Sequence, residues 1–158
     1  MKIGFIGAAA ALLMGASGAQ AAITFYNSEA AFKAALTPTV TENFNDAVLL
    51  QKLSVVSNAG SVGGGLWNDR VVRGGAQTTF SFAGGTKGAG GFWNETPGGF
   101  GQGLALTITL SAGGNQLLSQ EIVGFSGGFF GFTSTNKFDS LLITAGTQPG
   151  VAETYNLD

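Results

Sequence analysis

The sequence contains no cysteine and no histidine among its 158 residues. Without imidazole there can be no Ser-His-Asp triad, no histidine general base and no histidine metal ligand. Without a thiol there is no cysteine nucleophile, zinc finger or iron–sulfur site. Charge is also sparse, with seven lysines and arginines against nine acids and a net charge of −2. So few cations form no basic patch for a phosphate backbone. We therefore expect a protein that binds no nucleic acid and is not an enzyme.

The first 21 residues have the pattern of a signal peptide. Lys2 supplies a positive start, Ile3–Met14 is an uncharged apolar run, and Ala19-Gln20-Ala21 is the small-x-small pattern that signal peptidase cleaves. The run is too short to span a bilayer core of about 30 Å comfortably. We expect a signal peptide over 1–21, then a single exported domain over 22–158 with no membrane span. An exported domain without disulfides suits a bacterial envelope or culture fluid.

Glycine is abundant, with 27 residues, and a disordered or low-complexity filament would be one explanation. However, 44% of the residues are hydrophobic and the phenylalanines fall within alternating runs, whereas disordered chains are poor in aromatic residues. The composition therefore favours a folded domain. In such a domain the glycine pairs mark turns, bulges or places where backbones approach closely.

Periodicity predicts one helix and many strands. The segment after Asn27 or Ser28 has good helix formers and an acid in its first turn, and Pro38 ends it. In the segment 104–110, leucine and isoleucine alternate with alanine and threonine, which is typical of a half-buried strand. Further strands are expected over residues 39–44, 49–56, 66–72, 77–83, 118–124, 128–132, 138–144 and 153–157. The pattern predicts an all-β antiparallel sandwich, similar to a jelly roll, with one short N-terminal helix.

Two short segments of the chain echo one another. Gly64–Asp69 and Gly90–Glu95 both read Gly-Gly, a hydrophobic residue, Trp, Asn and an acid, and we interpret them as two similar strand entries. A Trp face can stack on a sugar while Asn and a carboxylate bind its hydroxyls. The candidate ligand-binding residues are therefore Trp67, Asn68, Asp69, Trp93, Asn94 and Glu95. The alternative is that the tryptophans pack in the core or at an edge and that the Asn-acid steps form turns.

Asp69 and Glu95 also raise the possibility of acid–base chemistry, because they occupy the same place in the two segments. A pair of carboxylates is what a hydrolase acting on polysaccharide would use. The alternative is two exposed carboxylates in turns.

A calcium site is predicted where oxygen ligands gather near the first expected core strand. Its candidate ligands are Glu42, Asn45, Asp46 and Asp158, with Glu153 as a further carboxylate near the chain end. Calcium takes six to eight oxygen ligands, which this set could supply in part. The alternative is a solvated strand end followed by an Asn-Asp turn.

Several strings resemble one bacterial class. Ile23–Leu36 followed by Thr39–Phe44 is similar to the opening of many exported proteins of the PEP-CTERM class, as are Gly124–Ser134 and Glu153–Asp158 in their places. The resemblance covers most of the mature chain. It implies an exported β-sandwich that is sorted by an exosortase and linked to extracellular polysaccharide or biofilm matrix in Gram-negative bacteria. It carries over no catalytic residues.

The class is defined by a C-terminal Pro-Glu-Pro element, an apolar span and basic residues, none of which precedes Asp158. We expect either a domain truncated at its C-terminus or a member released without a sorting tail. The expected function is a secreted non-catalytic binding or structural module of the envelope or extracellular matrix, associated with polysaccharide. The alternatives are the hydrolase and a self-associating matrix protein that pairs through an exposed strand edge.

Overall fold

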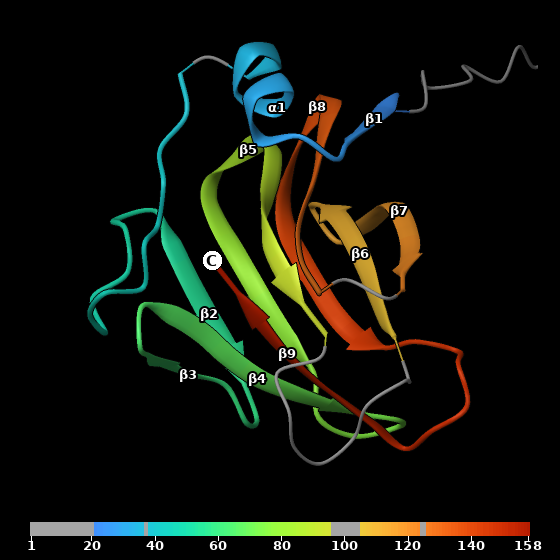
Figure 1. Cartoon of the computed structure of the whole chain (residues 1–158). Coiled ribbons are helices and arrows are strands. Elements are labelled where there is room, and N and C mark those ends of the chain that lie inside the picture. Colours follow the sequence, from blue (N-terminus) through green and yellow to red (C-terminus); the bar gives the residue numbers. More distant parts are fainter. Residues whose placement is uncertain (1–20, 37, 96–104, 124–125) are drawn as a thin grey trace, which may run out of the picture.

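The structure is a computed structural model that describes residues 21–36, 38–95, 105–123 and 126–158 (Figure 1). The signal peptide predicted over 1–21 lies outside these residues except for Ala21. The described residues form the helix α1 (Glu29–Ala35) and the strands β1 (Ile23–Tyr26), β2 (Leu53–Ser57), β3 (Ser61–Gly63), β4 (Leu66–Val72), β5 (Thr78–Asn94), β6 (Leu106–Ala112), β7 (Asn115–Ile122), β8 (Ser126–Ala145) and β9 (Ala152–Leu157). No helix of this described part is long and apolar enough to cross a membrane.

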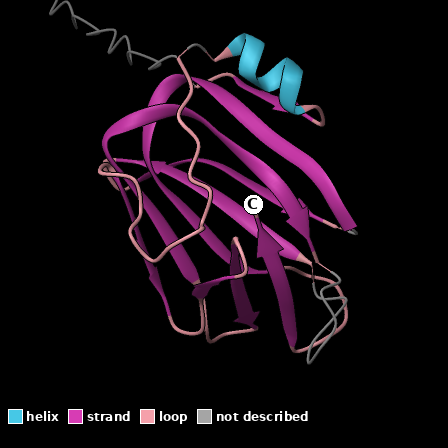
Figure 2. Cartoon of the chain, turned by 60° about the vertical axis from the view of Figure 1, so that its left-hand side comes forward, coloured by secondary structure: helices cyan, strands magenta, loops and turns pink. Residues whose placement is uncertain are grey.

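Two long strands, β5 and β8, join the two layers of the fold because each bends and runs through both (Figure 2). Residues 78–81 of β5 pair with 140–143 of β8, and residues 88–94 pair with 126–133. The register shifts between Ser81 and Thr86, where Gly84 and Gly85 have φ values of 82° and 70°. Glycine adopts such angles without steric cost. The sheet folds over at this corner.

All strand pairs are antiparallel, and each layer can be followed from its pairings. One layer contains β2, the start of β5, the end of β8, β6 and β7. The other contains β3, β4, β9, the end of β5, the start of β8 and β1. This arrangement confirms the predicted all-β sandwich with one short helix.

The core lies between the two layers and is formed by the side chains of alternate residues of the strands. In β6, Leu106, Ile108 and Leu110 are at most 1% exposed, whereas the threonines between them are half-buried. Across the layers, the ring centroid of Trp67 in β4 lies 5.8 Å from that of Phe80 in β5. The strand predicted from the alternation at 104–110 is therefore confirmed over the residues of β6 that it covers.

Helix α1 begins at Glu29, directly after the predicted cap residue Ser28. The Ser28 side chain accepts a hydrogen bond from the backbone N–H of Ala31, and Phe32 is the buried residue of the helix. The Phe32 ring lies 5.6 Å from the ring of Phe129 in β8, so α1 packs on the sheet rather than on another helix.

Three strand predictions need correction. The segment 39–44 is a loop, because the Glu42 carboxylate binds backbone N–H groups that a sheet would use and Phe44 adopts a φ of 47°. The two strands predicted over 128–132 and 138–144 are one strand, β8, which continues through the fold of the sheet. Beyond the predicted strands, residues 23–26 form β1 by pairing with β8.

Candidate functional site

The two echoed segments lie on either side of the same strand. Trp67 in β4 and Trp93 in β5 both stand opposite Leu157 of β9, and Asn68 and Asn94 both stand opposite the residue before it. The similar sequences therefore reflect a shared register on the two flanks of β9. Asn68 and Asp69 lie within β4, so no turn forms at that Asn-acid step, whereas Asn94 is the last residue of β5 and the chain bends at Glu95.

Asp69 is buried between the layers and binds four side chains. Its carboxylate accepts hydrogen bonds from Ser57 Oγ at 3.1 Å, Trp67 Nε1 at 3.2 Å and Tyr155 Oη at 3.0 Å, and also from Thr78 Oγ1. Ser57 and Thr78 belong to one layer, and the other partners belong to the opposite one. Asp69 therefore ties the two layers together and has little capacity left for a ligand.

This network changes the chemistry of its tyrosine. Burial raises the pKa of Tyr155 well above its ordinary value, and the negative charge of Asp69 raises this pKa further. Tyr155 is fully buried and stays neutral, as a hydrogen-bond donor, over the physiological range.

The second segment has different partners. The Trp93 indole is 3% exposed, donates from Nε1 to the backbone carbonyl of Phe130 at 3.1 Å, and stacks on Tyr155 with ring centroids 6.1 Å apart. Glu95 is 4% exposed. The alternative of two exposed turn carboxylates at Asp69 and Glu95 is thus wrong, since both are buried.

The asparagines of the segments lie on the other face of the same layer, where they are half-buried. Asn156 Nδ2 donates to Asn68 Oδ1 at 2.6 Å, and Asn68 Nδ2 donates to the carbonyl of Gly63 at 2.8 Å. The six predicted ligand-binding residues are therefore split between two faces. In this arrangement neither tryptophan offers an open ring face on which a sugar could stack.

Glu42, the first predicted calcium ligand, organises a loop. Its Oε1 accepts the backbone N–H groups of Asn43 at 2.9 Å and Phe44 at 3.0 Å, and its Oε2 accepts that of Leu50 at 2.8 Å. Both oxygens are engaged by the chain itself. This explains how the loop holds Phe44 in a left-handed conformation.

Of the other predicted ligands, Asn45 and Asp46 lie in the same loop as Glu42, and Asp158 follows β9. Asp46 Oδ1 accepts the backbone N–H of Val48 at 2.8 Å. Asp158 stands beside β5, and Glu153, 1% exposed, accepts the backbone N–H of Ala105. Among the described residues no three carboxylates come together as a metal site. Calcium binding stays a prediction.

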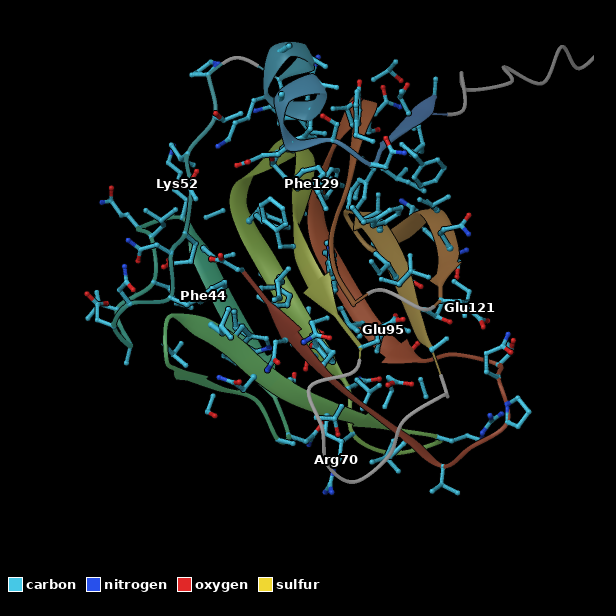
Figure 3. The ribbon with its side chains drawn as sticks, in the orientation of Figure 1. Phe44, Lys52, Arg70, Glu95, Glu121 and Phe129 are labelled. Carbon is cyan, nitrogen blue, oxygen red and sulfur yellow. The ribbon has the colours of Figure 1, made fainter. Side chains whose placement is uncertain are left out.

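A cleft of about 430 Å³ opens between α1, the loop 38–50 and the bent part of β5. Figure 3 labels Phe44, Lys52 and Phe129 on its border. Its lining is mainly apolar and includes seven aromatic rings: Phe32, Phe44, Phe80, Phe82, Phe92, Trp93 and Phe129. Cavities of this size and character are typical of sites for small or extended apolar ligands.

Charged groups line the cleft as well. Glu29 and Lys33 form an ion pair on α1, and Lys52, Glu42 and Asp158 also border it. Of the predicted ligand-binding residues only Trp93 lines this cleft. Sequence reasoning singled out Glu42 and Asp158 as calcium ligands and missed the other lining residues, because no local pattern shows that a helix and a bend in β5 lie against each other.

Comparisons with protein-family models, with curated protein sequences and with solved structures gave no significant match.

Proposed function

We propose that the chain is a secreted, non-catalytic binding module of the bacterial envelope or extracellular matrix, and that its ligand occupies the cleft beneath α1. The observation that carries this proposal is the cleft itself, about 430 Å³ in volume and lined by seven aromatic rings. Apolar lining with a few charges nearby favours burial of an apolar or amphipathic group over reaction chemistry.

The contacts of Asp69 support binding over hydrolysis. A glycosidase needs one carboxylate to donate a proton and another to act as base or nucleophile at the same substrate. Asp69 is 5% exposed, is bound by four side chains of the protein and does not line the cleft. It would have to give up this network before reaching a substrate.

The exposure of Phe92 also supports a site at the cleft. Phe92 is 39% exposed and lines the cleft, and so do the exposed side chains of Val40 and Leu50. Apolar groups that gather around a concave surface are typical of binding sites. Under this proposal the cleft binds extracellular polysaccharide through apolar substituents that fit there.

Two matched phenylalanines allow a direct test. Phe92 and Phe25 are 39% and 44% exposed and each contacts one neighbouring phenylalanine, but only Phe92 lines the cleft. Fluorescence titration with the amphipathic dye 1-anilinonaphthalene-8-sulfonate should show saturable binding to the folded mature protein. Phe92→Ala should weaken this binding on the order of five-fold, from the loss of about 1 kcal/mol of ring contact, and Phe25→Ala should leave it unchanged.

Near-ultraviolet circular dichroism of both variants checks that they remain folded. Equal effects of the two substitutions, or no saturable binding, would reject the cleft as the site. A glycan array with the same three proteins tests polysaccharide. Glycan binding that Phe92→Ala leaves unchanged would place the ligand elsewhere.

The calcium prediction has its own measurement. Thermal unfolding with calcium and then with a chelator should show a higher midpoint with calcium if the ion binds the folded state. An unchanged midpoint would reject the site, and the engagement of Glu42 by three backbone N–H groups makes a large shift unexpected.

A further inference from the structure

One layer of the sandwich carries rows of hydroxyl groups on its outward face. This layer contains β2, the start of β5, the end of β8, β6 and β7. Alternate residues of a strand point to opposite faces, and the inward positions include the buried side chains of Phe80, Ile108 and Ile143. The outward positions between them are mainly serine and threonine.

The pairing register aligns four serines across four neighbouring strands. Ser81 of β5 stands between Ser54 of β2 and Ser140 of β8. Ser140 in turn stands opposite Ser111 of β6. Because neighbouring strands lie about 4.8 Å apart, this serine row is about 14 Å long.

Two further rows lie parallel to the serine row, at steps of about 6.7 Å along the strands. The second row consists of Val56, Thr79, Leu142, Thr109 and Ser119. The third row consists of Thr144, Thr107 and Glu121. The three rows together form a surface of hydroxyl and methyl groups, which we call the hydroxyl face.

The hydroxyls of the serine row are available to a ligand. All four serines are exposed or half-buried, and within the described part of the chain their side chains make no hydrogen bond. By contrast, the inward hydroxyls of Ser57 and Thr78 are bonded to Asp69. A hydroxyl donates one hydrogen bond and accepts two, so each serine can serve a ligand in either role.

The hydroxyl face carries almost no charge. Glu121 is the one charged residue in its rows, and the carboxylate accepts hydrogen bonds from Thr147 and Gln148 at the edge of the layer. A charged ligand would lose its hydration there without meeting a counter-charge. The hydroxyl face therefore suits an uncharged ligand.

The abundance of serine favours a sugar over a protein as that ligand. Protein–protein interfaces are depleted in serine and have an apolar centre, whereas the centre of this face is the serine row. A neutral polysaccharide presents hydroxyls that both donate and accept. One sugar unit of an extended chain is about as long as the distance between neighbouring strands, so a chain that crosses the strands meets one serine for each unit.

We propose that the hydroxyl face binds a neutral polysaccharide, whose extended chain crosses the strands along the serine row. Methyl groups of the threonines, with Leu142 and Val56, would contact the apolar C–H surfaces of the sugar rings. No residue of the hydroxyl face lines the cleft beneath α1. The site is therefore separate from the cleft, and goes beyond the function proposed for it.

Affinity electrophoresis in native gels tests this site. The gels contain increasing amounts of hydroxyethyl cellulose as a neutral polysaccharide, or of polygalacturonate as a charged one. Hydroxyethyl cellulose should retard the folded mature protein in a saturable manner, and polygalacturonate should not.

Paired substitutions locate the binding. Ser81→Ala with Ser140→Ala removes the two central hydroxyls of the serine row and should weaken the retardation on the order of ten-fold. Thr24→Ala with Ser61→Ala removes two exposed strand hydroxyls of the opposite layer and is the matched control, which should leave it unchanged. Phe92→Ala, in the cleft, should also leave it unchanged. Thermal unfolding confirms that the variants are folded.

A single substitution of equal shape gives an independent measurement. Thr79 belongs to the second row and lies two residues from Ser81 in β5. Thr79→Val removes its hydroxyl, keeps the shape of the side chain and suits a strand. Retardation by hydroxyethyl cellulose should weaken several-fold in this variant.

The outcomes separate this inference from the proposal for the cleft. Equal retardation of the parent protein and the serine-row variant would overturn the hydroxyl face as the site, as would a loss confined to Phe92→Ala. Retardation by none of hydroxyethyl cellulose, dextran and galactomannan would overturn a neutral polysaccharide as the ligand. Light scattering that rises with concentration, and falls in the serine-row variant, would show that a second copy of the chain occupies the face. Retardation without dye binding would support this inference and reject the cleft alone.

Discussion

The two echoed segments occupy equivalent positions beside β9 and yet belong to different environments. In the first, Trp67 donates to the carboxylate of Asp69, which ties the layers together. In the second, Trp93 donates to a backbone carbonyl and lines the open cleft. The same sequence pattern therefore builds a sealed interior on one flank of β9 and part of a binding surface on the other. The difference teaches that register, and not function, is what the repeated pattern encodes.

The largest expected effect on stability comes from removing the Asp69 carboxylate, which is the centre of the buried network beside the first segment. Asp69→Leu leaves the buried donors Trp67 Nε1 and Tyr155 Oη without their acceptor, and should lower the free energy of unfolding by about 3–5 kcal/mol. Denaturant unfolding measures this loss. Asp46→Ala, at an exposed loop carboxylate, is the control and should cost at most about 1 kcal/mol. Equal losses would show that the Asp69 network is not the tie between the layers.

The two tryptophans should differ in both stability and binding. Trp67→Phe removes a hydrogen bond to a carboxylate and should cost about 2 kcal/mol, whereas Trp93→Phe removes one to a neutral carbonyl and should cost about 1 kcal/mol. Dye affinity should change in Trp93→Phe alone, because Trp93 lines the cleft and Trp67 does not. A loss of affinity in Trp67→Phe would contradict the division between the two sides.

The glycine pairs of the segments should respond differently to substitution. Gly64 has a φ of 66° and open space around it, so Gly64→Ala should cost about 1 kcal/mol through backbone strain. A Cβ on Gly90 would lie 2.7 Å from the Cα of Gly131, so Gly90→Ala should cost about 1–3 kcal/mol through overpacking. Asparagine tolerates the left-handed conformation, so Gly64→Asn should recover stability and Gly90→Asn should not. Rescue at both positions would show that the two pairs serve the same purpose.

The smallest effect is expected from alkaline titration of Tyr155 in β9, the strand between the two segments. Burial and Asp69 raise the folded pKa of Tyr155 above its unfolded value near 10. The stability that this shift provides is fully present below pH 10 and is lost as the pH rises from there through the folded pKa, because the unfolded chain releases the proton first. Absorbance at the tyrosinate band during unfolding at increasing pH measures this loss. Tyr155→Phe should remove it, and an unchanged alkaline loss in that variant would assign it to another group.

Local patterns in the sequence were enough for much of the fold. Ser28 as a helix cap and the alternating residues of β6 follow from rules that act within a few residues, and both are found in the structure. The loop at 39–44 could not be read in this way. Its residues favour a strand, but the Glu42 side chain reaches Leu50, eight residues along the chain, and takes up the backbone groups that a strand would need.

By itself the sequence determined the class of the fold, the helix and the matching register of the two Trp-Asn-acid segments, because periodicity and residue type act locally. Only the tertiary structure decided that Asp69 is buried in a network and that Trp93 lines a cleft. Those roles depend on how β5 bends and where β9 lies, and contacts between residues distant in the chain set both. Identical short patterns therefore acquired different environments, since burial and hydrogen-bond partners are properties of the packed layers.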